Sequence, residues 1–130
     1  MSVFAEIGAD WEYYIDPATF RMPKAKSEVP VGCVVLVRSR ETDEERTFVN
    51  TTFYFATSSG LSPLTKAQAS AILVKQMAQY VKEKGHWPPS ATVKRARRDG
   101  SVDITYSPTH YDSLKLSMTA GLPVAKSRNS

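Results

Sequence analysis

The sequence predicts an α+β fold: an antiparallel sheet of about five to six strands with one main amphipathic helix, packed on the sheet or on a partner subunit. Two observations lead to this prediction. Short β-branched runs bounded by turn residues occur on both sides of the middle of the chain, and one long run with helical periodicity lies between them. With 130 residues, of which 42% are hydrophobic, we expect one domain over 1–130.

The first strands are expected before residue 58. A short strand is predicted at Trp11–Ile15, inside a loosely structured opening segment, 1–30, that is rich in proline and lysine. The β-branched run that starts at Val31 predicts a strand in the centre of a sheet, with apolar neighbours on both faces. After an acidic loop at 41–45, residues 46–57 predict a second strand that pairs with it as an antiparallel hairpin.

The clearest element is a helix over about 64–84, which follows a turn-rich breaker. Two signals compete for its start. Thr65 followed by Gln68 makes a capping box, in which each side chain bonds the backbone N–H of the other residue. Ser62 before Pro63 offers an earlier N-cap, with proline at the first helical position. Both alternatives place the first helical turn near residue 64.

An apolar stripe runs along this helix, and Gly85 provides a left-handed stop at its end. The small alanines of the stripe allow close approach to a sheet, which is the commoner arrangement, or to a second copy of the helix. For the second alternative, the expected interface residues are Val74, Met77, Ala78 and Val81. The full stripe comprises Leu64, Ala67, Ala71, Val74, Ala78 and Val81, flanked by Leu73, Met77 and Tyr80.

Residues 92–107 predict a second hairpin. Asp99-Gly100, between two alternating runs, favours a two-residue type I′ turn in which Arg98 pairs with Ser101. Beyond it, the tail 109–130 is expected to hold a short strand or one helical turn. The predicted register gives one face Val93, Arg95, Arg97, Val102, Ile104 and Tyr106, and the other face Thr92, Lys94, Ala96, Arg98, Asp103 and Thr105.

This second hairpin is the candidate nucleic-acid site. On the predicted register, Arg95 and Arg97 would pair with phosphates while the Tyr106 ring stacks on an unpaired base. Lys94 and Arg98 would point away and add a diffuse positive field. A second interpretation fits equally well: the charges protect a sheet edge from aggregation, and the arginine stems cover apolar residues.

The charge of the chain is uneven. Residues 1–65 hold 6 Lys and Arg against 9 Asp and Glu, whereas residues 66–130 hold 11 against 4. The second half is therefore strongly basic. Such a segment attracts polyanions and binds them with a steep salt dependence. We therefore expect an anionic partner, nucleic acid in the first place.

The sequence holds no motif that indicates an enzyme. It has no glycine-rich phosphate loop after a strand, no His or Cys pair with metal-ligand spacing and no GxSxG. His86 and His110 fall on loop-like segments, and Cys33 falls inside an apolar strand, where a cysteine is usually a small buried residue. We expect no catalytic residues, no metal and no cofactor.

The opening residues carry acids where a secretory signal has a basic start and an apolar run, and no stretch of 18 apolar residues occurs. We therefore expect no membrane partner and no secretion by a signal peptide. A location in a virion or in the cytoplasm is expected.

A strand with an aromatic-rich end, a helix, a Lys-Gly turn and a Pro-Ser-Ala segment follow one another between about residues 51 and 91. Together they resemble the coat proteins of single-stranded RNA bacteriophages. The resemblance implies a dimer whose two sheets join, helices that cross over the partner, and RNA on the inward face of the sheet. Members of that family place more strands before this helix and little after it. The matching residues are Phe53, Phe55, Ala56, Thr57, Ile72, Leu73, Val74, Lys75, Met77, Lys84, Gly85, Pro89, Ser90 and Ala91.

Charge, helix stripe and resemblance together predict RNA binding coupled to self-assembly from homodimers, as in a viral coat protein. Two alternatives stay open. One is a small nucleic-acid-binding regulator that forms no shell. The other is a viral or bacterial protein-interaction or inhibitor protein.

Overall fold

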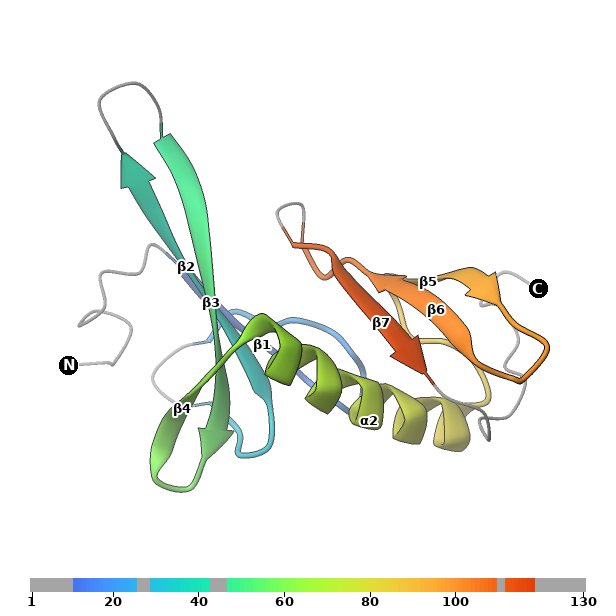
Figure 1. Cartoon of the computed structure of the whole chain (residues 1–130). Helices are drawn as coiled ribbons and strands as arrows, with labels where there is room; N and C mark the ends of the chain where they lie inside the picture. Colours follow the sequence, from blue (N-terminus) through green and yellow to red (C-terminus); the bar gives the residue numbers. More distant parts are fainter. Residues whose placement is uncertain (1–10, 26–28, 43–46, 110–111, 119–130) are drawn as a thin grey trace. The chain divides into compact units, whose positions relative to one another are not determined.

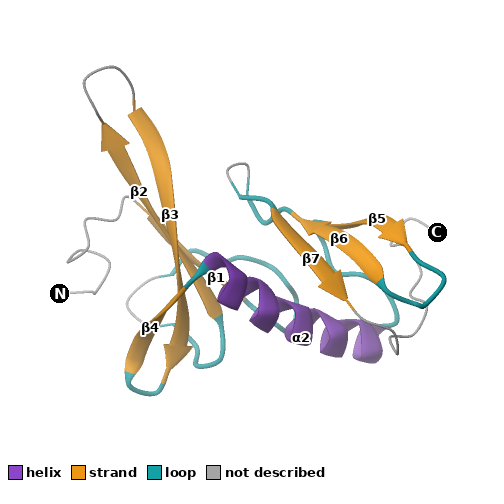
Figure 2. Ribbon diagram, viewed as in Figure 1, coloured by secondary structure: helices purple, strands orange, loops and turns teal. Residues whose placement is uncertain are grey.

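A computed structural model gives the structure of this protein over residues 11–25, 29–42, 47–109 and 112–118 (Figure 1). The fold is α+β, as predicted, but the strands form two antiparallel sheets instead of one. The described residues contain seven strands, where five to six were expected. The elements are β1 Trp11–Ile15, β2 Val34–Thr42, β3 Thr47–Thr57, β4 Gly60–Leu64, α2 Lys66–Lys84, β5 Ala91–Ala96, β6 Val102–Tyr106 and β7 Leu114–Met118 (Figure 2).

The chain divides into two compact units. The first contains the four-stranded sheet, and the second contains the three-stranded sheet and most of α2. Because units that are defined by contacts need not fold separately, a single domain over 1–130 stays a prediction. The units consist of Met1–Asp16 with Met22–Ala69, and of Pro17–Arg21 with Ser70–Ser130.

The first sheet has the strand order β1-β2-β3-β4, with every pair antiparallel. The predicted central position of β2 is confirmed, because β1 and β3 flank it and residues 34–37 are at most 2% exposed on both faces. The strand starts at Val34, three residues later than predicted. Val31 is 66% exposed, and the turn that precedes β2 contains Gly32 with a φ of 95°.

Strand β4 was not predicted, since its residues were assigned to a turn-rich breaker. Only Ser58 and Ser59 form the turn, and residues 60–64 then pair with β3. Pro63 lies within β4, opposite Tyr54. Because β4 is an edge strand, the missing N–H of the proline can point away from the ladder without loss of a hydrogen bond.

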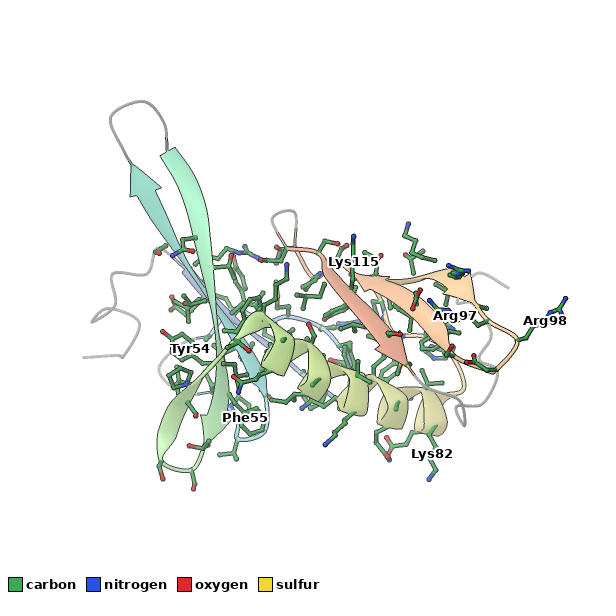
Figure 3. The ribbon with its side chains drawn as sticks, in the orientation of Figure 1. Tyr54, Phe55, Lys82, Arg97, Arg98 and Lys115 are labelled. Atoms are coloured by element: carbon green, nitrogen blue, oxygen red, sulfur yellow. The ribbon has the colours of Figure 1, made fainter. Side chains whose placement is uncertain are left out.

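One face of the first sheet packs against the segment that follows β1. This segment is held by hydrogen bonds from Tyr14 N to Pro23 O, 3.1 Å, and from Ala25 N to Glu12 O, 3.0 Å. Tyr54 lies on this face and Phe55 on the opposite one (Figure 3), as alternation along β3 requires. The buried residues on this face form a hydrophobic cluster of Ala25, Val35, Val37 and Ala56, with Tyr14, Val29, Tyr54 and Leu61 packed against it.

Of the two predicted N-caps, the capping box starts the helix. Gln68 N donates to Thr65 Oγ1 at 3.1 Å, and Thr65 N donates to Gln68 Oε1 at 2.9 Å. Helix α2 therefore begins at Lys66, while Ser62 remains in β4. The predicted stop at Gly85 is confirmed, with a φ of 79° and a hydrogen bond of 2.8 Å to Val81 O.

The buried side of α2 is rotated from the predicted stripe. Ala67 and Ala71 are exposed, and Val74 and Ala78 are half-buried. The prediction gave alanines the same weight as large side chains, but leucine, methionine and tyrosine bury more apolar area and therefore decide which side faces inward. The buried residues of α2 are Ala69, Leu73, Met77, Tyr80 and Val81.

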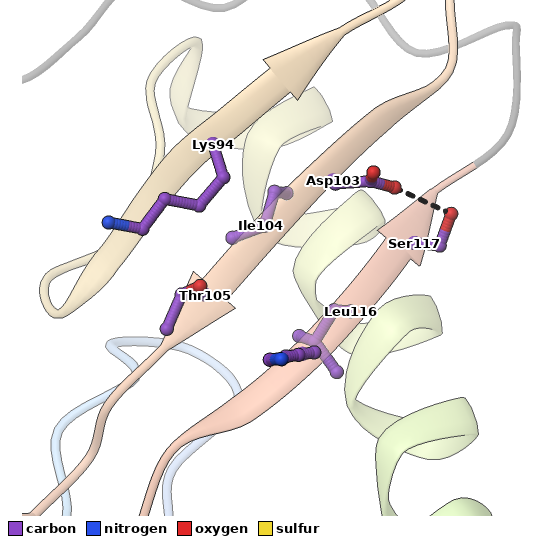
Figure 4. Close-up of a pocket in the computed structure, with 7 residues that line it drawn as sticks. Lys94, Asp103, Ile104, Thr105, Leu116 and Ser117 are labelled. Atoms are coloured by element: carbon purple, nitrogen blue, oxygen red, sulfur yellow. Dashed lines mark hydrogen bonds between the residues drawn. The ribbon is translucent and has the colours of Figure 1, made fainter.

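The second sheet has the order β5-β6-β7 and is antiparallel throughout. In the second unit, α2 lies across one face of this sheet (Figures 1 and 4). Of the two structures expected for the tail, the strand forms, as β7. The side chains on the covered face are buried: Ile104, Tyr106, Leu114, Leu116 and Met118.

Candidate nucleic-acid interface

The turn between β5 and β6 differs from the predicted two-residue turn. Arg97 N donates to Ser101 O at 2.9 Å, and Gly100 N donates to Arg97 O at 3.1 Å, so the loop has three residues, 98–100. A type I′ turn needs positive φ at both Asp99 and Gly100, whereas a three-residue loop needs it only at its last position. Among these residues only Gly100, at 90°, has a positive φ. The predicted pairing of Arg98 with Ser101 is therefore wrong.

This shift of one residue changes the faces of β5. Ala96 pairs with Val102 and Arg95 with Asp103, and a bulge at Lys94 shifts the register once more, so that Val93 pairs with Ile104. A one-residue slip moves side chains to the opposite face of a sheet. The prediction that Arg95 shares a face with Tyr106 is therefore wrong as well.

Tyr106 belongs to the core of the second unit. Its side chain is 0% exposed, and its ring packs edge-on against Phe20, with ring centroids 5.6 Å apart. The hydroxyl donates to Phe20 O at 3.4 Å, and burial raises the pKa of the phenol. A base could not stack on this ring in the structure.

The uncovered face of the second sheet gathers basic residues. We call Lys94, Arg95, Arg97 and Lys115 the basic face. The pairings make two cross-strand rows on it, since residues directly opposite each other share a face. Arg98 lies in the turn and points away from the sheet (Figure 3). The two rows are Thr92, Thr105 and Lys115, and Arg95, Asp103 and Ser117.

Asp103 organises one end of this face. Its carboxylate accepts two hydrogen bonds from the Arg97 guanidinium, one of them 2.9 Å from Nη1 to Oδ1, and a third bond of 3.1 Å from Ser117 Oγ. The bond from Arg97 lowers the pKa of Asp103, and the same bond raises the pKa of Arg97. Arg97 is thus neutralised locally. Within the part of the chain that the structure describes, Lys94, Arg95 and Lys115 form no ion pair.

A hollow of about 570 Å³ lies over the basic face (Figure 4). Lys94 and Lys115 provide ammonium groups from β5 and β7, and Thr105 provides a hydroxyl from β6 between them, whereas the Ser117 hydroxyl already donates to Asp103. Ammonium and hydroxyl groups are donors that suit phosphate oxygens. The lining residues are Lys94, Asp103, Ile104, Thr105, Lys115, Leu116 and Ser117.

Lys115 is the residue of this face that the sequence analysis missed, because it fell in the predicted tail. The sequence nevertheless contains a pattern that predicts the position of Lys115. Residues 114–118, LKLSM, alternate between apolar and polar side chains, which is typical of a half-buried strand with Lys115 on its open side.

The predicted interface residues on α2 fall into two groups. Met77 and Val81 are 0% exposed within the single chain, so a partner could not reach them in this structure. Val74 and Ala78 are half-buried, and an interface there stays a prediction.

The other candidate groups are dispersed. Cys33 is 3% exposed, as expected, and burial together with the charge of Asp16 raises the pKa of its thiol. His110 lies outside the described residues. Over the ranges that the structure describes, no three His, Cys, Asp or Glu side chains gather as metal ligands, and no helix is long and apolar enough to span a membrane.

Comparison of the chain with models of protein families, with curated proteins and with solved structures gave no match in any of the three. The resemblance to phage coat proteins therefore stays a prediction.

Proposed function

We propose that this protein binds RNA through the basic face, by contacts to phosphates instead of stacking on bases. The observation that carries the proposal is that Lys94 and Lys115 line one hollow on the second sheet, with Arg95 beside it on the same face, opposite Asp103. Among the described residues of β5, β6 and β7 the one aromatic residue is Tyr106, which lies on the opposite, buried face, so charge and hydroxyl groups provide the contacts. Contacts of this kind position a nucleic acid without reading its sequence.

The competing interpretation, edge protection, accounts for charges on β5 and β7, which are both edge strands. Edge protection requires a charge on each edge strand. It does not require that charges from both edge strands line the same hollow. Cations two strands apart are separated by about 10 Å, since neighbouring strands lie about 4.8 Å apart. This spacing allows an extended polyanion to contact both edge strands at once.

The experiment compares two double variants with the same net charge. Arg95→Gln with Lys115→Gln removes cations from the basic face. Lys75→Gln with Lys82→Gln removes two exposed cations from α2, which lies across the opposite face of the sheet, and Lys82 points away from it (Figure 3). Binding of a single-stranded RNA oligonucleotide is measured by fluorescence anisotropy over a series of salt concentrations.

We expect the basic-face variant to weaken binding about tenfold at low salt, since two exposed charge contacts contribute about 1.4 kcal/mol. The slope of log K against log salt should flatten by about 1.4, or about 0.7 for each lost contact to a single strand. The α2 variant and Tyr106→Phe should bind like the wild type. Equal weakening by both double variants would mean that only net charge matters and would contradict a site on this face.

Coupling of RNA binding to self-assembly remains part of the proposal, supported by the half-buried Val74 and Ala78 on α2 and by the partial coat-protein resemblance. Light scattering after size exclusion, with absorbance at 260 nm, tests it. A monomer without nucleic acid at physiological salt would refute assembly and leave the regulator alternative.

A further inference from the structure

A second hollow, of about 380 Å³, lies at the C-terminal end of α2 and shares no lining residue with the basic face. Three stretches of the second compact unit form it: the segment 18–21, the last turns of α2 and the loop that follows Gly85. Its volume lies within the range of small-molecule sites. The lining residues are Ala18, Thr19, Arg21, Tyr80, Lys84, His86 and Pro89.

The segment that carries Arg21 is anchored by the residue before it. Phe20 is 3% exposed and has a φ of 54°, a conformation that bulky residues rarely adopt. Its ring packs edge-on against Tyr80 and Tyr106, with centroid distances of 5.5 and 5.6 Å, and its carbonyl accepts the Tyr106 hydroxyl. Arg21 N also donates to Thr19 Oγ1 at 3.2 Å. These contacts hold Arg21 at the rim of the hollow.

The opposite rim comes from α2 and its following loop. Lys84 lies one helical turn after Tyr80, so both occupy the same side of the helix. The His86 ring packs edge-on against Tyr80, with centroids 5.7 Å apart. His86 Nδ1 lies 3.0 Å from Trp87 O, the distance of a hydrogen bond that an Nδ1–H would donate to the carbonyl.

We propose that this hollow binds the phosphate group of a phosphomonoester, and we call it the phosphate pocket. Arg21 and Lys84 provide a planar fork of donors and a compact ammonium, two groups that bind phosphate well. None of the lining residues is acidic. The nearest acid along the helix, Glu83, accepts a hydrogen bond of 2.7 Å from Gln79, on a different side of the helix from Tyr80 and Lys84.

The C-terminal end of α2 opposes anion binding, because the carbonyl groups at the C-terminus of a helix carry partial negative charge. Gly85 N already donates to Val81 O, which satisfies one of these carbonyls, and Lys82 and Lys84 offset the remaining partial charge. Binding by the phosphate pocket does not depend on RNA binding by the basic face.

The test measures binding of inorganic phosphate and ribose 5-phosphate to the full chain by isothermal titration calorimetry at fixed ionic strength. The variants are Arg21→Gln and Lys84→Gln. The matched control is Lys82→Gln, which removes the same charge from the same helical turn but from a residue outside the pocket. A second arm compares 5′-phosphorylated and 5′-hydroxyl RNA oligonucleotides of one sequence.

We expect the wild type to bind phosphate saturably. Arg21→Gln and Lys84→Gln should each weaken this binding about tenfold, as for loss of one charge-assisted hydrogen bond. Lys82→Gln should change it less than twofold. Tighter binding of the 5′-phosphorylated strand, lost in Lys84→Gln, would identify an RNA end as the source of the phosphate. No difference between the strands, with ribose 5-phosphate still bound, would identify a free metabolite. Absence of saturable binding, or equal weakening by Lys82→Gln, would overturn the proposal even if the basic face binds RNA.

Discussion

Arg97 and Asp103 are joined by two hydrogen bonds across the end of the β5–β6 hairpin. Asp103 pairs in the ladder with Arg95, so Arg97 reaches it from the first position beyond β5. The pair therefore stabilises the three-residue loop and at the same time removes one positive charge from the basic face. Turn geometry and surface charge are coupled in this hairpin.

Removal of the Asp103 charge should strengthen RNA binding. In Asp103→Asn, the Arg97 guanidinium loses its ionic partner and becomes available to phosphates. We expect affinity for single-stranded RNA to rise about threefold to tenfold at low salt, with a salt slope steeper by about 0.7 for one new contact. Anisotropy titrations over a salt series measure both quantities.

Glu83→Gln is the matched control for this variant, because it removes one acid from the surface of α2 and leaves Arg97 paired. It should change affinity much less than Asp103→Asn. If Asp103→Asn instead weakens binding, Arg97 needs its partner to be positioned and the carboxylate is part of the site.

Stability should decrease in acid because of the same pair. The pKa of Asp103 is lowered in the folded protein, so its contribution is fully present above the unfolded pKa of about 3.9 and is lost as the pH falls through the folded pKa. Asp99, bonded to Ser101, has a lowered pKa and acts in the same direction. We expect urea unfolding to show a difference between wild type and Asp103→Asn at pH 7 that shrinks below about pH 4. A difference that is constant with pH would argue against an ionic contribution.

The capping box gives a prediction that separates the two helix starts. Thr65→Ala removes the acceptor for Gln68 N and should lower the free energy of unfolding by about 1 kcal/mol. Ser62→Ala changes an exposed residue of β4 and should stay within about 0.5 kcal/mol of the wild type. Urea denaturation followed by circular dichroism at 222 nm measures both. The reverse order of effects would place the N-cap at Ser62.

The features that the sequence predicted well are local ones. An uninterrupted apolar run is typical of a strand with both faces covered, so residues 34–37 alone predict the central position of β2. The capping box and the stop at Gly85 depend on residues within one helical turn of each other. The alternation at 114–118 carried similar information about Lys115.

The β5–β6 hairpin shows a feature that the nearby sequence does not determine. Asp99-Gly100 is compatible with two loops that differ by one residue, and the choice between them decides which side of the sheet receives Arg95. Nothing near residue 100 indicates that Phe20, 86 residues before Tyr106, provides the carbonyl and the ring that bury the tyrosine.

The sequence by itself determined the type of every described element except β4 and β7, a basic second half and, apart from Lys115, the residues from which a site could be made. Only the tertiary structure decided that the strands separate into two sheets, that Tyr106 lies in the core and that Lys115 joins Lys94 over one hollow. The physical reason is that propensity and capping act over a few residues, whereas register and burial are set by packing between segments far apart in the chain.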